Sequence, residues 1–72
     1  MDRKYVIEND AFGTIIGTKE QIDFIMSSIN NKACHYWNLA IEDPENKEFW
    51  EEEALKITHI YCDIFYQREA QK

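Results

Sequence analysis

The last third of the chain, residues 43–72, constrains the fold most strongly because it has the pattern of one long amphipathic helix. Asp43 and Pro44 form a start signal, since aspartate can cap the free amides of a first turn and proline loses no hydrogen bond there. Apolar residues then recur at steps of three and four, namely Trp50, Ala54, Ile57, Tyr61 and Ile64, widened by Phe49, Ile60 and Phe65. The pattern predicts a helix over about 44–70 with a broad apolar face.

The N-terminal segment has the pattern of a β-hairpin. Residues 4–8 and 11–16 are rich in β-branched and aromatic side chains, and the turn formers Asn9 and Asp10 lie between them. Gly17 is expected to end the second strand. Because two strands alone are marginally stable, we expect a helix to pack against the hairpin.

Two further helices are predicted between the hairpin and the long helix. Thr18 and Gln21 match a capping box for a helix over about 18–29. Asn30 and Asn31 tolerate the left-handed conformation and are expected to end it. Residues 32–41 fit both a helical and an alternating pattern, and we favour helix because a two-stranded sheet leaves this segment no obvious partner.

These elements predict an α+β, mainly helical fold with a short N-terminal β-hairpin followed by three helices, the C-terminal one longest. A chain of 72 residues has room for one hydrophobic core, so residues 1–72 are expected to form a single small globular domain of marginal stability. The hydrophobic fraction of 44% is sufficient for such a core and argues against disorder.

The net charge of −6 limits the possible partners. A phosphate backbone or an anionic membrane surface would repel the chain, so we expect neither direct nucleic-acid binding nor membrane binding. A protein partner with a basic surface fits the sign of the charge. The N-terminus leads into no long apolar run, and two cysteines are too few for a disulfide scaffold, so a cytoplasmic location with reduced thiols is expected.

Cysteine and histidine residues supply the only candidate transition-metal ligands, Cys34, His35, His59 and Cys62. Adjacent residues such as Cys34 and His35 point in different directions on a helix, and the paired cysteine spacing of zinc sites is missing. The alternative is that the cysteines pack in the core and the histidines lie on the surface. We therefore predict no metal and no cofactor.

Enzymatic activity is not expected. A reactive thiolate needs an electropositive environment, whereas this chain is acidic and offers only the isolated Gly13 as a candidate anion-binding loop. Paired carboxylates near Glu51 could act as acid and base, but such chemistry needs a cleft that so few residues can hardly build. A solvated helix face is the simpler interpretation of these carboxylates.

The aromatic and acidic residues are the best candidates for a binding surface. Trp50, Tyr61 and Phe65 are expected in the core, but Phe49 beside Trp50 and Tyr36 beside Trp37 cannot all face it, because adjacent helical residues are about 100° apart. One of each pair should point outward, where aromatic residues often anchor interfaces. The predicted partner-binding residues are Tyr36, Trp37, Glu45, Glu48, Phe49, Glu51, Glu52 and Glu53.

Three functions remain as hypotheses. The first is a small acidic protein-binding module, an inhibitor or regulator that blocks a partner's surface; an anti-defence protein of a phage or mobile element would suit its size and acidity. The second is a homo-oligomer that self-associates and binds a planar ligand or nucleotide at an aromatic subunit interface, with few cations for phosphates besides Arg3, Lys4, Lys19 and Lys32. The third is a structural subunit of a larger assembly.

Overall fold

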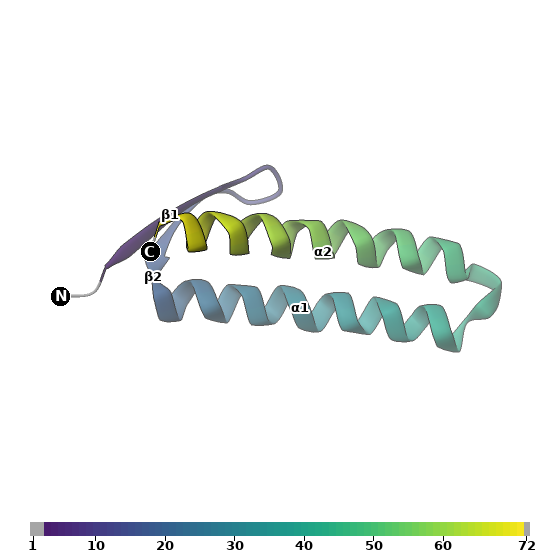
Figure 1. Ribbon diagram of the computed structural model, residues 1–72. Helices are drawn as coiled ribbons and strands as arrows, with labels where there is room; N and C mark the ends of the chain where they lie inside the picture. Colours follow the sequence, from purple (N-terminus) through teal and green to yellow (C-terminus); the bar gives the residue numbers. More distant parts are fainter. Residues whose placement is uncertain (1–2, 72) are drawn as a thin grey trace.

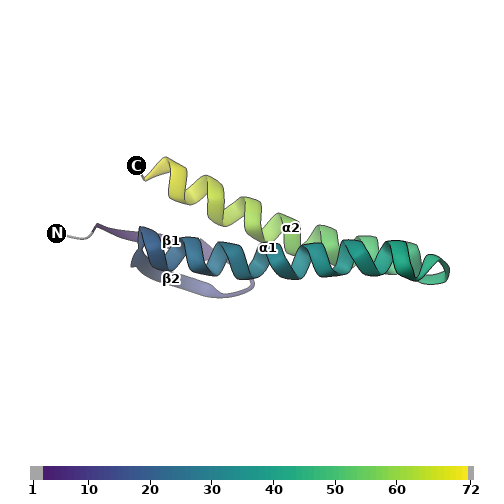
Figure 2. The same ribbon diagram turned by 90° about the horizontal axis from the view of Figure 1, so that it is seen from below.

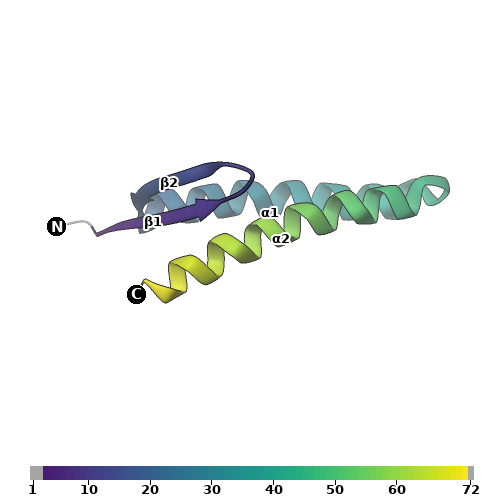
Figure 3. The ribbon, with the colours of Figure 1, turned by 90° about the horizontal axis from the view of Figure 1, so that it is seen from above.

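A computed structural model, which describes residues 3–71, gives the chain a β-hairpin and two long antiparallel helices (Figure 1). The α+β, mainly helical class is confirmed, but the predicted three helices are two. The elements are β1 (Lys4–Asn9), β2 (Gly13–Thr18), α1 (Lys19–Glu42), the 3-10 turn η1 (Pro44–Asn46) and α2 (Lys47–Ala70). The molecule measures 50 × 19 × 16 Å. The hairpin lies on one side of the helix pair, only along the half where β1 begins and α2 ends (Figures 2 and 3).

The prediction that a helix ends at Asn30 and Asn31 is wrong, because α1 runs unbroken through them. Neither asparagine adopts the left-handed conformation, which among the described residues is confined to Gly13. An asparagine costs a helix interior at most about 0.7 kcal/mol relative to alanine. The buried stripe of α1 continues past both asparagines to Ala33 and Ala40, and packing of that stripe against α2 outweighs the propensity cost.

Residues 32–41 are helical, as expected, but they are the second half of α1 and not a separate helix. Both α1 and α2 contain 24 residues, so the C-terminal helix is not the longer one. The chain reverses at Asp43, where Pro44 occupies the first position of η1 and α2 starts only at Lys47. Asp43 does not cap this turn through its side chain. Its carboxylate instead binds Asn46 and Trp50.

The predicted hairpin is confirmed, with β1 one residue longer than expected and the second strand shifted from residues 11–16 to Gly13–Thr18. Asn9 pairs with Gly13, and residues 10–12 form the loop. The Oδ1 atom of Asn9 accepts hydrogen bonds from the amides of Ala11 (2.8 Å) and Phe12 (3.2 Å). Gly13 follows with a φ of 77°, a conformation that favours glycine over residues with a Cβ atom.

Gly17 does not end β2, which continues to Thr18. The predicted capping box of α1 is confirmed. The hydroxyl of Thr18 accepts a hydrogen bond from the Gln21 amide, and Gln21 Oε1 accepts one from the Thr18 amide. A Cβ atom at Gly17 would lie 2.9 Å from Gln21 Oε1. A Cβ atom here would displace the capping side chain, so glycine leaves room for the capping box while the backbone stays in the strand.

The hydrophobic core lies between the hairpin and the helices, at one end of the molecule. Its buried members are Tyr5, Ile7, Ile22, Met26, Ile29 and Ile64. Each fully buried isoleucine contributes about 1.5–3 kcal/mol relative to an exposed one. The stripe on α2 agrees with the prediction at Ala54 and Ile64, whereas Phe65 is 37% exposed and does not belong to this core. Beyond the hairpin, the buried side chains Ala33, Ala40 and Ala54 are small, so the helices can approach closely.

The outer edge of β1 is covered by two glutamine side chains of α2. Gln71 accepts from the Val6 amide (2.9 Å) and donates to the Val6 carbonyl (2.6 Å). Gln67 does the same with the amide (2.7 Å) and carbonyl (2.6 Å) of Glu8. Four helical residues rise about 6 Å and two strand residues about 6.7 Å, so the two spacings match. Asp63 extends the row by accepting from Asn9 Nδ2 at 3.0 Å.

Candidate functional site

The predicted partner-binding residues all lie at one end of the molecule, where α1 turns into α2 (Figure 1). We call residues 36–53 the acidic tip. The hairpin and the core are at the other half of the helix pair (Figure 3). The tip is therefore a single layer of two helices, and its side chains are not covered by another element of the chain.

A stack of aromatic rings organises the tip. The rings of Tyr36 and Trp50 are stacked, with centroids 5.8 Å apart and planes at 17°. Phe49 approaches Trp50 edge-on at 4.9 Å. These separations are in the range where aromatic pairs contribute about 0.5–1.5 kcal/mol beyond their buried area. The stack joins the end of α1 to the start of α2 and gives the tip a defined shape.

Asp43 locks the turn beneath this stack. Its Oδ2 atom accepts hydrogen bonds from Asn46 Nδ2 (2.9 Å) and from Trp50 Nε1 (3.2 Å). The hydrogen bond from the Asn46 side chain, followed by that from Trp50, lowers the pKa of Asp43 below its ordinary value of 3.8. The ionised carboxylate therefore holds both the turn and the indole ring in place.

One member of each aromatic pair faces outward, as the 100° spacing predicts. Phe49 is 54% exposed and Trp37 is 37% exposed, whereas Tyr36 and Trp50 are half-buried. Trp37 borders a shallow hollow of about 390 Å³ together with Ala40, Ile41, Pro44, Lys47 and Glu51. The outward aromatics thus lie at two places: Phe49 beside the stack and Trp37 beside the hollow.

The carboxylates of the tip differ in whether the chain already neutralises them. Glu51 lies 3.8 Å from Lys47, and Glu53 lies 3.2 Å from Lys56. Glu45, Glu48 and Glu52 are exposed and form no ion pair within residues 3–71. Positions 42–53 contain Lys47 as their single cation. The tip consequently carries a concentrated negative charge around its exposed aromatic rings.

Sequence reasoning missed Ile41, which is 77% exposed and borders the hollow beside Trp37. The signal was present, because Ile41 follows the buried Ala40 directly and must therefore point about 100° away from it. Ala40 and Ile41 both fit the helical pattern of residues 32–41, but only Ala40 is buried in α1.

The candidate metal ligands are dispersed over the fold. Cys34 is exposed and Cys62 is half-buried, and both are free thiols. The ring of His35 lies 5.9 Å from that of Tyr36, whereas His59 borders a hollow beside the hairpin turn. Across residues 3–71 no three cysteine, histidine or acidic side chains come together as a metal-binding group.

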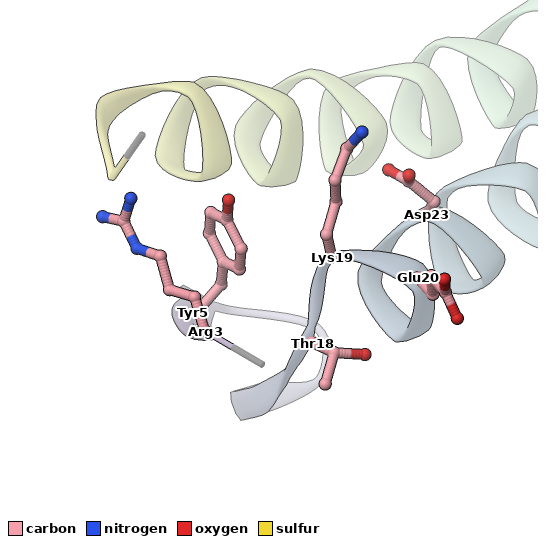
Figure 4. Close-up of a pocket in the computed structure, with 6 residues that line it drawn as sticks. All are labelled: Arg3, Tyr5, Thr18, Lys19, Glu20 and Asp23. Carbon is pink, nitrogen blue, oxygen red and sulfur yellow. The ribbon is translucent and has the colours of Figure 1, made fainter. Parts of the chain in front are cut away.

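Two of the few cations, Arg3 and Lys19, border a hollow of about 270 Å³ at the hairpin end (Figure 4). Arg3 lies over the ring of Tyr5, with 5.2 Å between the guanidinium carbon and the ring centroid. The carboxylates of Glu20 and Asp23 border the same hollow, and Asp23 forms an ion pair with Arg68 of α2. These acidic neighbours offset the positive charge, so the hollow does not favour a phosphate group.

Neither described helix has an apolar stretch long enough to cross a lipid bilayer. No family model matches the chain, and the searches of curated proteins and of solved structures gave no significant match. The geometry and charge of the acidic tip are therefore the features of this chain that indicate a function.

Proposed function

We propose that the chain is a small acidic protein-binding module that acts as an inhibitor or regulator by occupying a basic surface of a partner protein. The acidic tip supplies the contact. The observation that carries the proposal is the exposure of Phe49 and Trp37 at a tip where Glu45, Glu48 and Glu52 form no ion pair within residues 3–71. Exposed aromatic anchors surrounded by charge are the composition of an interface with a small apolar centre and a polar rim.

The rigidity of the tip favours binding. The stack of Tyr36 on Trp50 and the hydrogen bonds of Asp43 fix the turn before a partner arrives. A preorganised surface loses less conformational freedom on association than a mobile loop does. The free carboxylates of Glu45, Glu48 and Glu52 would steer a basic partner toward the aromatic rings.

The role of the tip's charge in binding is tested by replacing its carboxylates with amides of nearly the same shape. The variant E45Q/E48Q/E52Q removes three exposed carboxylates that form no ion pair within residues 3–71 and leaves the pairs of Glu51 and Glu53 intact. The matched control, E8Q/D10N/E20Q, removes the same charge at the hairpin end. The immobilised chain and both variants are used to capture protein from a lysate of the source cells, and the retained partner is then titrated by calorimetry.

We expect the tip variant to bind the partner about tenfold more weakly, which corresponds to about 1.4 kcal/mol, and to lose most of the salt dependence of binding. The control variant should bind as the unmodified chain does. F49S, made in the unmodified chain, should also weaken binding, since it removes an aromatic anchor. Equal affinities of the tip variant and the control, with unchanged helix content by circular dichroism, would exclude the acidic tip as the contact.

The main alternative is a homo-oligomer that binds a planar ligand, and it makes a different prediction. Native mass spectrometry of the purified protein would then show an oligomer with the additional mass of a small molecule. The acidic neighbours of Arg3 and Lys19 argue against a nucleotide at that hollow. No contact in the described part of the chain favours the third hypothesis, a structural subunit, over the first.

A further inference from the structure

We infer that the outer edge of β2 pairs with the β2 strand of a second copy of this chain, so that two hairpins form one continuous antiparallel sheet. The inference concerns the hairpin half of the molecule and does not depend on the acidic tip. It follows from which main-chain groups of the hairpin are already bonded, which are free, and what surrounds the free ones.

The hydrogen bonds of the glutamine side chains establish which groups of β1 point outward. The amides and carbonyls of Val6 and Glu8 are bonded to Gln71 and Gln67, so they point away from β2. Opposite residues of an antiparallel pair share one orientation. Because Val6 is opposite Ile16 and Glu8 is opposite Thr14, the main-chain groups of Ile16 and Thr14 also point outward.

Thr18 supports this orientation and limits the length of the free edge. Its amide donates to Gln21 Oε1 at 2.8 Å, so it too points away from β1. Within residues 3–71 the outward groups of Thr14 and Ile16 have no such partner. The two edges of the hairpin therefore differ, since β1 is covered by the chain's own side chains while β2 presents unpaired strand groups.

The free edge borders a groove of mixed polar and apolar lining between β2 and the first turns of α1. This groove has a volume of about 780 Å³, and its apolar lining includes Ile15, Ile16, Phe24 and Ile25. Phe24 is 74% exposed and Ile16 is 66% exposed. An open strand edge beside exposed apolar side chains is the kind of surface that binds an added strand.

The sequence of β2 matches a second copy of itself. The strand Gly-Thr-Ile-Ile-Gly-Thr carries no charge, so no like charges face each other where the two strands pair. An antiparallel pairing centred on Ile15 places Thr14 opposite Ile16 of the second copy, and the reverse. Each such pair can exchange both main-chain hydrogen bonds, so this register uses every free group of Thr14 and Ile16.

The arrangement also keeps the acidic tips apart. The tips lie at the far end of a molecule 50 Å long, and pairing at β2 relates the two copies by a two-fold axis. Because β1 is already covered, no third copy can add to the sheet, and the assembly closes as a dimer. A sheet of four strands is also more stable than an isolated two-stranded sheet, which is only marginally stable in water.

The test uses a proline that removes only the outward amide. In I16P the chain loses the Ile16 N–H, which has no partner within residues 3–71, and proline is tolerated at such an edge position. The control is I16V, because valine has as many side-chain carbons as proline but keeps the amide. The dimer dissociation constants of the native chain and both variants are measured by sedimentation equilibrium from low to high micromolar concentration.

We expect the native chain and I16V to dimerise with similar dissociation constants. The dissociation constant of I16P should be at least about tenfold higher, because the substitution removes one hydrogen-bond donor from each of the two copies. A native chain that stays monomeric at all concentrations would overturn the inference. So would an I16P dimer as stable as that of I16V, since the contact would then lie elsewhere on the molecule.

Amide hydrogen exchange of the native chain gives a second measurement that does not depend on how I16P folds. The amides of Thr14 and Ile16 should exchange more slowly as the protein concentration rises. Those of Val6 and Glu8 should be protected to the same extent at every concentration, since Gln71 and Gln67 bind them within one copy. Exchange at Thr14 and Ile16 that does not change with concentration would overturn the inference.

Discussion

The side-chain amide of Gln71 forms with the main chain of Val6 both hydrogen bonds that a neighbouring strand would form. Gln67 repeats the arrangement one helical turn earlier with Glu8. A helix thus acts as the third strand of a two-stranded sheet, using side chains in place of main-chain groups. The consequence is a hairpin with one closed edge and one open edge.

The glutamine contacts should stabilise the fold measurably. In Q67A/Q71A the outward groups of Val6 and Glu8 lose their partners, and we expect the free energy of unfolding to fall by about 1–3 kcal/mol, at about 0.5–1.5 kcal/mol for each strand position. Urea titration followed by circular dichroism measures the change. E52A on the same helix is the control, since Glu52 is exposed and forms no ion pair in the described chain. A loss no larger than that of E52A would contradict the role of the glutamines.

The same double variant should change the association of the chain. With the β1 edge open, both edges of the hairpin can accept strands, so we expect species larger than a dimer or visible aggregation. Size-exclusion chromatography with light scattering measures the mass. A mass distribution identical to that of the native chain would show that the glutamines do not limit strand pairing.

The titration of Asp43 should be displaced to low pH. Its pKa is lowered in the folded chain by the Asn46 and Trp50 hydrogen bonds, so its stabilising effect is fully present above its unfolded value near 3.8. The effect is lost as the pH falls below 3.8 through the lower folded pKa. A carbon-detected NMR titration of the Asp43 carboxyl should give a midpoint under 3.8, and D43N should lack this component of acid unfolding. A midpoint at or above 3.8 would contradict these hydrogen bonds.

Close helix packing next to the acidic tip depends on small side chains. Ala54 is fully buried, and A54L would force the helices apart or push side chains out of their preferred rotamers. We expect a destabilisation of about 1–3 kcal/mol in urea unfolding, together with an altered Tyr36–Trp50 stack in near-ultraviolet circular dichroism. A70L, at the exposed end of α2, makes the same substitution without a packing change. Equal stabilities of the two variants would mean that the helices do not pack closely at Ala54.

The core should respond to the loss of a single methylene. Ile64 is fully buried, and I64V should lower the free energy of unfolding by about 0.5–1.5 kcal/mol. The same change at Ile41, which is 77% exposed, should have little effect. Thermal unfolding of both variants measures the difference. A larger loss of stability in I41V than in I64V would contradict the position of the core at the hairpin end.

Local signals in the sequence predicted the hairpin, the capping box of Thr18 and Gln21, and the outward aromatic of each adjacent pair. These features depend on residues close together in the chain, where backbone and side-chain geometry is nearly independent of the rest of the fold. The predicted binding residues come from two segments of the sequence, 36–37 and 45–53, and the structure brings both segments together at the acidic tip. The role of that tip in binding stays a prediction.

The sequence by itself determined the hairpin, the start of α1 and the helical periodicity of α2, because periodicity and capping act over one or two turns. The tertiary structure decided the rest. Asn30 and Asn31 stay helical because Ala33 and Ala40 extend a stripe that packs on α2, and this packing exceeds the small propensity cost. The partnership of Gln71 with Val6 joins residues 65 positions apart, and no local pattern encodes such a contact. Only the tertiary structure therefore decided which edge of the hairpin is covered.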